Sequence, residues 1–316
     1  MKKISVFIPA RNEEGNIEEL LEKVDNAFQS LKNYKCELIM VNDGSTDKTG
    51  ELLESAKKKY DFLKVFHHRK GQGLTQAMKT GFEHVTGEFV LFLPADLESD
   101  PEEDIPKLTH SLVESNLDVV TGWRQGRGDG KNLSSFIYNA ISRSLFGVKV
   151  HDMNWIKGFK RELLDDLELR SDWHRFIIMM AANKGYTIGE VKTSWHHRKA
   201  GKSKFGLMRF PIALVDTLVV KFNMVFGSKP MHFFSMIGLF VMLAGFIGLV
   251  FLAYHYLVND TQIRPLFTLS TTLLIAGIQL FVTGFLAEIV VSQKDEISEI
   301  RKKMKAFERK SPDNEA

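Results

Sequence analysis

Two segments decide the predicted fold: residues 4–14, ISVFIPARNEE, and residues 37–47, ELIMVNDGSTD. In each, an apolar run typical of a β-strand leads directly into polar residues. Similar runs occur at residues 62–66, 89–93 and 118–121, and helical spacing of apolar residues separates them, as at Ile17, Leu20, Leu21, Val24 and Phe28. Repeated strand-helix-strand units predict an α/β fold with a mainly parallel sheet. Ligands of such sheets bind beyond the carboxyl ends of the strands.

The residues that follow the predicted strands are therefore the candidates for function. Asn42–Asp47 can bind a ligand, or can form a turn that caps a helix from Lys48. Arg69–Gly73 places cations and backbone N–H groups where a phosphate can sit. Asp96 and Glu98 suit a Mg²⁺ or Mn²⁺ ion that also binds substrate phosphates, or they cap a helix that starts near Pro101.

The C-terminal part contains two long apolar segments. Residues 233–258 contain no Asp, Glu, Lys or Arg, and in residues 265–291 Glu288 is the only one. Each segment exceeds the ~20 residues needed to cross a bilayer, and core helices of soluble domains rarely run this long without charge. The short connector, residues 259–264, predicts a transmembrane helical hairpin.

Basic residues predict the orientation of this hairpin. Lys221 and Lys229 precede the first segment, Arg264 lies in the connector, and seven Lys and Arg residues follow the second segment. By the positive-inside rule, the N-terminal part and the tail are cytoplasmic. The apolar residues 4–9 are too few for the core of a signal peptide, which agrees with a cytoplasmic N-terminal part. Together with the hairpin, this predicts an integral protein of the cell inner (cytoplasmic) membrane.

Composition sets broader limits. The chain has 316 residues, of which 44% are hydrophobic and 26% charged, and its net charge of +3 gives no reason to expect nucleic acid as a partner. A single cysteine excludes a disulfide framework. The predicted parts are a catalytic domain (1–205), amphipathic juxtamembrane helices (206–231), the hairpin (232–292) and a charged cytoplasmic tail (293–316).

Five ordered motifs carry a resemblance to a known family. They are Ile8–Glu14, Val41–Asp47, Gly71–Gly81, Gly87–Glu88 and Ala95–Glu98. Over about residues 1–205 they resemble glycosyltransferase family 2, which has the GT-A fold. With Asp152–Lys160, Asp172–Phe176, His196–Gly206 and the hairpin added, nearly the whole chain resembles the polyprenyl-phosphate glycosyltransferases, such as dolichol-phosphate mannose synthases and undecaprenyl-phosphate glucosyltransferases.

The resemblance implies site residues position by position. It implies metal binding by Asp96, to which Glu98 adds a second carboxylate, and a catalytic role for Asp96, Arg124 and Arg198. The nucleotide-sugar site would contain Pro9, Arg11, Glu13, Val41, Asp43, Asp96, Glu98 and Lys204. The acceptor phosphate would be bound by Arg124, Lys131, Ser135, Arg198, Ser203 and Lys204. The segment Arg198–Lys204 can instead bind anionic lipid headgroups, and both roles are compatible.

Three positions depart from the family pattern. Arg11 stands where Tyr is usual, and Glu98 where Gln is usual. Pro94 replaces the first Asp of the Asp-x-Asp motif, which removes a carboxylate. Either Glu98 restores the pair of carboxylates around Mg²⁺ or Mn²⁺, or the metal site is weak or absent.

The expected function is an inverting transfer of a hexose from a GDP- or UDP-linked sugar to polyprenyl phosphate at the cytoplasmic face of the membrane. One alternative is transfer to a lipid hydroxyl with Asp172 as the base. Another is a catalytically inactive nucleotide-sugar-binding scaffold, which the Pro94 substitution suggests. The resemblance is also compatible with a homo-oligomer.

Overall fold

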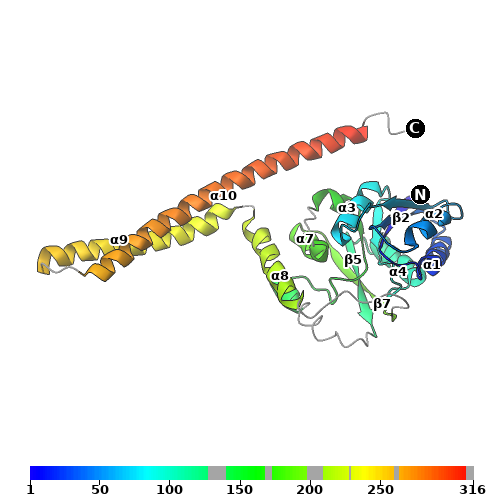
Figure 1. Ribbon diagram of the computed structural model, residues 1–316, viewed down its shortest axis with the longest axis horizontal. Helices are drawn as coiled ribbons and strands as arrows, with labels where there is room; N and C mark the ends of the chain where they lie inside the picture. The colour runs from blue at the N-terminus through cyan, green and yellow to red at the C-terminus, as the bar shows by residue number, and fades with distance from the viewer. Residues whose placement is uncertain (127–139, 168–172, 198–208, 228, 260–262, 311–316) are drawn as a thin grey trace. The chain divides into compact units, whose positions relative to one another are not determined.

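The computed structural model describes residues 1–126, 140–167, 173–197, 209–227, 229–259 and 263–310 (Figure 1). The chain divides into two compact units, Met1–Thr217 and Leu218–Ala316. All strands of the described part lie in the first unit, and the described residues of the second unit are helical almost throughout.

The first unit is built on a seven-stranded sheet with strand order β3-β2-β1-β4-β6-β5-β7. Pairing is parallel throughout except at β6, which is antiparallel to β4 and to β5. This confirms the predicted α/β fold with a mainly parallel sheet. The strands are β1 (Lys2–Ala10), β2 (Tyr34–Asn42), β3 (Leu63–His67), β4 (Phe89–Phe92), β5 (Val119–Gln125), β6 (Lys157–Lys160) and β7 (Ile188–Ser194).

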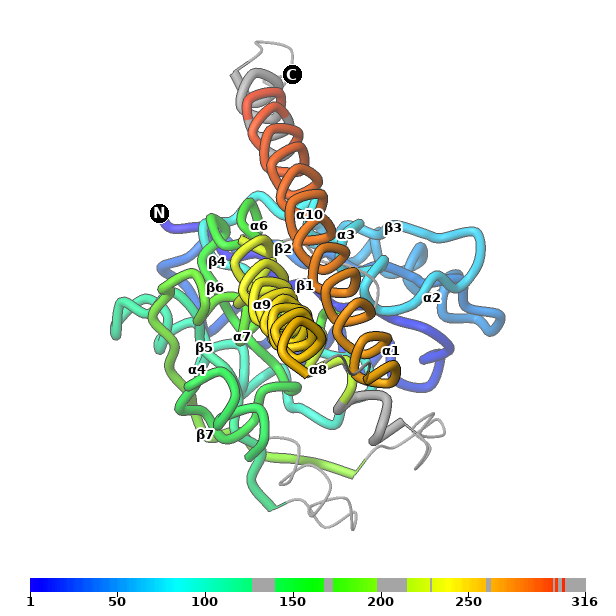
Figure 2. Tube along the Cα trace, turned by 90° about the vertical axis from the view of Figure 1, so that its left-hand side faces the viewer, coloured from blue at the N-terminus to red at the C-terminus, as the bar shows by residue number. Residues whose placement is uncertain are grey.

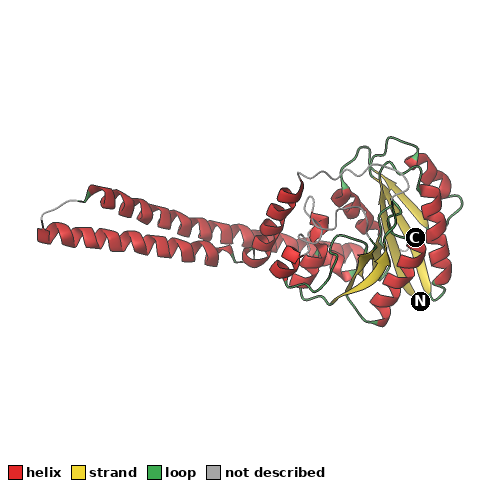
Figure 3. Ribbon diagram, turned by 90° about the horizontal axis from the view of Figure 1, so that it is seen from below, coloured by secondary structure: helices red, strands yellow, loops and turns green. Residues whose placement is uncertain are grey.

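Helices cover both faces of the sheet (Figure 3). On one face α1 and α4 pack on each other and bury Ile4, Val6 and Ile8 of β1. On the other face α3 lies so close that a Cβ at Gly81 would overlap the Phe7 ring, which also contacts Phe82 edge-on. The helices of this unit are α1 (Ile17–Ser30), α2 (Thr49–Ala56), α3 (Leu74–His84), α4 (Pro101–Glu114), α6 (Glu162–Asp166), the 3₁₀ helix η1 (Trp173–Phe176) and α7 (Ile177–Asn183).

Helix α8 (Arg209–Phe226) begins in the first unit and ends in the second, where α9 (Pro230–Asn259) and α10 (Arg264–Lys310) pack side by side (Figure 2). Both α9 and the first part of α10 are long and apolar enough to cross a membrane. Small residues let their backbones approach, since a Cβ at Gly277 would lie 2.5 Å from the Met242 amide nitrogen. The Glu288 carboxylate accepts a hydrogen bond of 3.2 Å from the Met231 amide in the first turn of α9.

Candidate active site

The carboxyl ends of the first four strands meet at one edge of the sheet. In the strand register Ala10 lies beside Asn42, and Asn42 lies beside His67. Phe92, the last residue of β4, pairs with Phe7 of β1. The loops that follow β1, β2, β3 and β4 therefore share one edge, where the sequence predicts a ligand site.

The loops after β1 and β2 are joined by polar contacts. The Thr46 amide donates to Asn12 Oδ1 at 2.9 Å, and the Glu13 amide donates to Thr49 Oγ1 at 2.9 Å. Asn42 Oδ1 accepts from the Ser45 amide at 3.0 Å, and Asp47 Oδ1 from the Thr49 amide at 3.0 Å. The predicted turn is thus present, but α2 begins at Thr49 instead of Lys48, and its N-cap residue, Lys48, makes no side-chain capping hydrogen bond.

Asp43 anchors the loop after β3. The residue is 4% exposed, and its carboxylate accepts hydrogen bonds of 2.8 Å from the amides of Gln72 and Gly73. His68 Nδ1 lies 2.8 Å from Asp43 Oδ1, and Arg11 Nη1 lies 4.0 Å from Oδ2. Burial opposes ionisation, but these amide and histidine contacts outweigh it and hold the pKa of Asp43 below its ordinary value. Asp43 is therefore an ionised group that fixes the loop carrying Arg69 and Lys70.

Two glycines permit this close arrangement of loops. Gly44 has φ +62°, and a Cβ there would overlap the backbone of Lys70 and Gly71. A Cβ on Gly71 would overlap the Arg11 guanidinium, so the Arg11 side chain lies across Gly71. Arg11, the departure from the usual Tyr, thus contributes a cation at this edge with a side chain that is 47% exposed.

Asp96 and Glu98 follow β4 at the same edge. Asp96 is 9% exposed, and its Oδ1 accepts from the Glu98 amide at 3.2 Å across Leu97, which has φ +56°. The interpretation that these carboxylates cap the next helix is wrong, because Asp100 caps α4 by accepting from the Glu102 amide.

The donor chemistry of this pair fits a divalent cation. Two carboxylates two residues apart provide the hard oxygen ligands that Mg²⁺ uses together with substrate phosphates and water. The residues that the structure describes contain no group of three His, Cys, Asp or Glu side chains placed to hold a metal.

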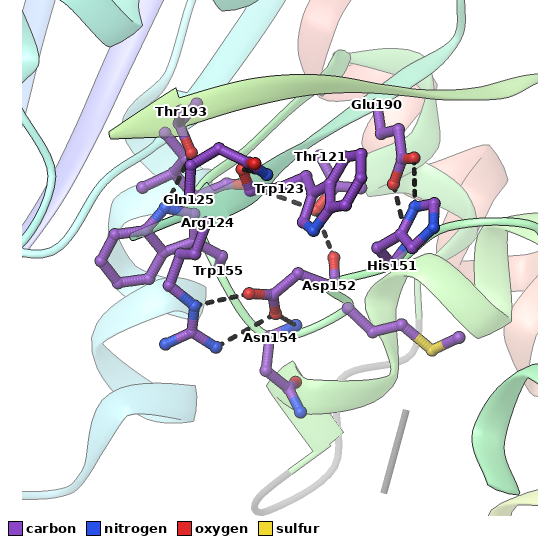
Figure 4. A network of polar contacts seen from close by, with 12 residues as sticks. Thr121, Trp123, Arg124, Gln125, His151, Asp152, Asn154, Trp155, Glu190 and Thr193 are labelled. Atoms are coloured by element: carbon purple, nitrogen blue, oxygen red, sulfur yellow. Dashed lines mark hydrogen bonds and ion pairs between the residues drawn. The ribbon is translucent and has the colours of Figure 1, made fainter. Parts of the chain in front are cut away.

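Arg124, at the end of β5, is held from two sides (Figure 4). Its Nε and Nη2 donate to Oδ2 and Oδ1 of Asp152, the second bond at 3.1 Å, and its guanidinium lies 4.7 Å from the Trp155 ring centroid. Trp155 Nε1 donates in turn to Thr193 Oγ1 at 3.2 Å. This bidentate pair and stacked ring fix the guanidinium orientation. The sequence analysis did not identify Asp152 as the partner of Arg124.

A second group that the sequence analysis missed is Lys157, at the start of β6. It is 3% exposed, and its Nζ donates to the Met153 carbonyl at 3.4 Å and lies 5.8 Å from the Phe92 ring centroid. Burial lowers the pKa of Lys157 to about 8, against the opposing effect of the Asp152 carboxylate. Its signal in the sequence is a lysine inside the apolar run Trp155–Phe159.

His174 in η1 lies close to this lysine. Its Nδ1 is 2.9 Å from Thr75 Oγ1 at the start of α3. Burial, together with the charges of Lys157 and Arg175, lowers the pKa of His174 to about 3, so the imidazole is neutral at physiological pH.

The remaining predicted residues divide into two groups. Pro9 and Val41 are paired in the strand register, Val41 is fully buried, and Glu13 Oε2 accepts from Asn16 Nδ2 at 2.6 Å. Lys131, Ser135, Asp172, Arg198, Ser203 and Lys204 lie outside the described residues.

Comparison with known proteins gives matches over most of the chain. The family model described as Glycosyl transferase family 2 matches residues 5–184. Dodecaprenyl-phosphate galacturonate synthase from Rhizobium johnstonii is 32% identical over 299 residues, which cover 91% of this chain and 87% of that protein. Undecaprenyl-phosphate 4-deoxy-4-formamido-L-arabinose transferase from Pseudomonas paraeruginosa is 29% identical over 292 residues, which cover 90% of this chain and 84% of that protein.

A solved structure matches the fold of a large part of the chain. Glucosyl-3-phosphoglycerate synthase from Mycobacterium tuberculosis, crystallised with Mn²⁺, UDP-glucose and glycerol 3-phosphate, aligns with a TM-score of 0.55 and 20% identity. The alignment covers 70% of this chain and 80% of that one. At this identity the match supports a common fold.

Proposed function

Because the chain belongs to glycosyl transferase family 2, we propose that it transfers a sugar from a nucleotide donor to a polyprenyl phosphate. The observation that carries this proposal is the extent of the two curated relatives, which are named for polyprenyl-phosphate acceptors and align over 91% and 90% of this chain. One relative is named for galacturonate, a sugar acid, and the other for a formamido-arabinose, which has no carboxylate. Their names therefore leave the sugar open.

The donor end of the proposed site is formed by the loops after β1 to β4. Asp43 fixes the loop that carries Arg69 and Lys70, and Arg11 adds a third cation near the nucleotide diphosphate. Asp96 and Glu98 would hold a Mg²⁺ or Mn²⁺ ion together with diphosphate oxygens. When bound, the ion supplies positive charge that stabilises the leaving diphosphate.

The acceptor end contains Arg124. Its bidentate bond to Asp152 and its stacking on Trp155 orient the guanidinium before the lipid phosphate arrives, so binding requires little reorganisation. An oxygen of the lipid phosphate attacks the anomeric carbon, the bond from that carbon to the diphosphate breaks, and the nucleoside diphosphate leaves. This single displacement inverts the anomeric centre. The attacking oxygen is already an anion, so no proton has to be removed.

The membrane part of the proposal rests on the apolar helices and their flanking charges. The two helices that can span a bilayer begin at Pro230 and Arg264. Lys221 and Lys229 before the first helix, and the basic residues after the second, support a catalytic domain on the cytoplasmic face of the inner membrane. A water-soluble donor and a membrane-bound phosphate would then meet on the same side.

The test uses the purified full chain in detergent. It is incubated with Mg²⁺ or Mn²⁺, undecaprenyl or dolichyl phosphate, and a panel of UDP- and GDP-linked sugars, and mass spectrometry identifies the glycolipid. We expect a glycosyl phosphate of inverted configuration, loss of transfer in Asp96→Ala, and unchanged transfer in Asp61→Ala, a control at an exposed position. Absence of any glycosyl phosphate across the panel would overturn the proposal.

Two further readouts separate the alternatives. Asp172→Asn should retain most of the transfer, since a phosphate acceptor needs no base, whereas a loss of several orders of magnitude would favour a hydroxyl acceptor. Nucleotide binding without transfer to any lipid would identify an inactive scaffold. Protease accessibility of the tail in inverted membrane vesicles tests the cytoplasmic orientation.

A further inference from the structure

The ammonium group of Lys157 is a buried cation that has no bonded anion among the residues that the structure describes. Only 3% of the residue is exposed, and among the residues that the structure describes its single hydrogen-bond acceptor is the Met153 carbonyl, at 3.4 Å. The Asp152 carboxylate nearby is engaged by both Nε and Nη2 of Arg124. An ammonium group has three donors, and a buried charge without a partner costs several kcal/mol. Buried ionisable groups of this kind cluster at ligand-binding and catalytic sites.

The position of Lys157 is the second observation. Because β6 is antiparallel to its neighbours, its first residue lies at the carboxyl edge of the sheet, beside Phe92 of β4 and Thr121 of β5. The β4 chain continues from Phe92 to Asp96, and the β5 chain continues from Thr121 to Arg124. Lys157 is therefore between the strand that leads to the proposed diphosphate site and the strand that carries the proposed acceptor-phosphate residue. The group that lies between those two phosphates during the reaction is the transferred sugar.

The surroundings of Lys157 leave an excess of positive charge. Lys157 and Arg175 are both close enough to lower the pKa of His174, and that imidazole is neutral. His174 is tied to Thr75 and thereby joins η1 to the first turn of α3, which places it beside the loop that Asp43 holds. The carboxylate that acts on Lys157, Asp152, already has both oxygens bonded by Arg124, and the imidazole beside Lys157 carries no charge.

We propose that Lys157 is a specificity-determining residue that binds a carboxylate carried by the transferred sugar, so that the donor is a nucleoside diphosphate linked to a hexuronic acid. This inference rests on the proposed function, in which a cation at Asp96 and the Arg124 guanidinium serve the two phosphates. With both phosphates served by these groups, the carboxylate of a uronic acid is the one anion of the donor and acceptor left without a partner. The ammonium group of a buried lysine side chain suits a single carboxylate.

The experiment compares matched donors that differ in one carboxylate. The purified full chain is assayed with UDP-galacturonate against UDP-galactose, UDP-glucuronate against UDP-glucose, and GDP-mannuronate against GDP-mannose. The variant is Lys157→Met, which keeps the length and apolar volume of the stem. The control is Lys160→Met on the same strand, where Lys160 Nζ bonds Asp118 at 2.6 Å.

We expect the wild-type chain to prefer a uronate donor, and Lys157→Met to lower kcat/KM for that donor by about 10- to 100-fold, the value of a charge-assisted hydrogen bond. Transfer from the matched neutral donor should stay equal or rise, and Lys160→Met should keep the wild-type preference. The melting temperature of Lys157→Met should not fall, because the change removes an uncompensated buried charge.

Three outcomes overturn the inference. One is an equal fall of kcat/KM for the uronate and neutral donors in Lys157→Met, which would indicate that Lys157 binds a phosphate. Another is a wild-type chain that prefers a neutral sugar donor, with the same donor preference in Lys157→Met. A third is a fall in melting temperature that accounts for the lost activity, which would assign Lys157 to the stability of the fold. In all three cases sugar transfer itself persists in the wild-type chain, whereas failure of the proposed function would abolish transfer from every donor.

Discussion

Removal of the Asp152 charge should separate positioning of Arg124 from its chemistry. In Asp152→Asn the amide oxygen can still accept one hydrogen bond, but the side-chain NH₂ group faces the other guanidinium donor. The side chains of Arg124 and Asp152 are 13% and 8% exposed, so water compensates little. Loss of one charge-assisted hydrogen bond and of the charge that neutralises Arg124 should lower the free energy of unfolding by about 2–4 kcal/mol. For a domain of this size we expect the melting temperature to fall by about 5–10 °C.

The assay combines stability with kinetics. All four tryptophans, at positions 123, 155, 173 and 195, lie in the first unit, so tryptophan fluorescence in detergent reports its unfolding. We expect kcat/KM for the lipid acceptor to fall at least about tenfold in Asp152→Asn, because the guanidinium loses its fixed orientation.

Two comparisons make the result specific. Glu190→Gln removes the partner of His151 in the same part of the structure, but that pair is more exposed, at 48% and 21%, and should change stability by less than about 1 kcal/mol (Figure 4). The double variant Arg124→Met with Asp152→Leu should recover stability without recovering transfer, since it removes both charges. An Asp152→Asn protein with wild-type melting temperature and acceptor kcat/KM would refute the reasoning.

Three other changes test the fold and the donor end. Asp43→Asn leaves the Gln72 or Gly73 amide facing a side-chain NH₂ group, so affinity for nucleotide, measured by calorimetry, should fall by about 10-fold or more; unchanged affinity would contradict the anchoring role. Burial opposes ionisation of Glu37, but hydrogen bonds from Ser5 and Thr86 lower its pKa to about 2, so this group contributes stability above its unfolded value near 4.5 that is lost as the pH falls toward 2. Between pH 4.5 and 2, the free energy of unfolding of the wild-type chain should therefore fall by up to about 3 kcal/mol more than that of Glu37→Gln. If the two proteins lose stability in parallel as the pH falls, Glu37 does not make this contribution. Gly277→Leu should separate α9 from α10 and increase protease cleavage in membranes, whereas Ile275→Leu, at a residue that is 59% exposed, should not.

The fold could be predicted where strands are buried on both faces. Residues 4–8 and 37–41 are nearly continuous apolar runs, as central parallel strands require, and both were identified from that pattern. The strands β6 and β7 were not predicted. β6 has the sequence KGFK, in which Phe159 is the only large apolar residue, and β7 lies at the sheet edge with Glu190 and Lys192 in its sequence. A periodicity rule cannot assign a strand whose register is set by its neighbours.

The site was predictable to the extent that it follows from strand order. Asp43 and Asp96 were identified because they come directly after parallel strands. Asp152 and Lys157 lie in the segment 152–160 that carries part of the resemblance, but neither was given a role, because β6 is antiparallel and brings Lys157, its first residue, to the same edge from the opposite direction. The contact between Thr75 and His174 joins residues 99 positions apart, and no local pattern encodes it.

Asp43, Asp152 and His174 are arranged for binding rather than for proton abstraction. Asp43 accepts two backbone amides, and Asp152 accepts a bidentate guanidinium, so the lone pairs that a base would need are engaged. His174, with a pKa of about 3, is too weak a base to take a proton from a hydroxyl near neutral pH. A neutral hydroxyl acceptor would need such a base, whereas a phosphate acceptor needs cations and a fixed geometry. Arg124, oriented by Asp152 and Trp155, would provide that geometry for the proposed phosphate acceptor, and Asp172→Asn tests the one candidate base, which lies outside the described residues.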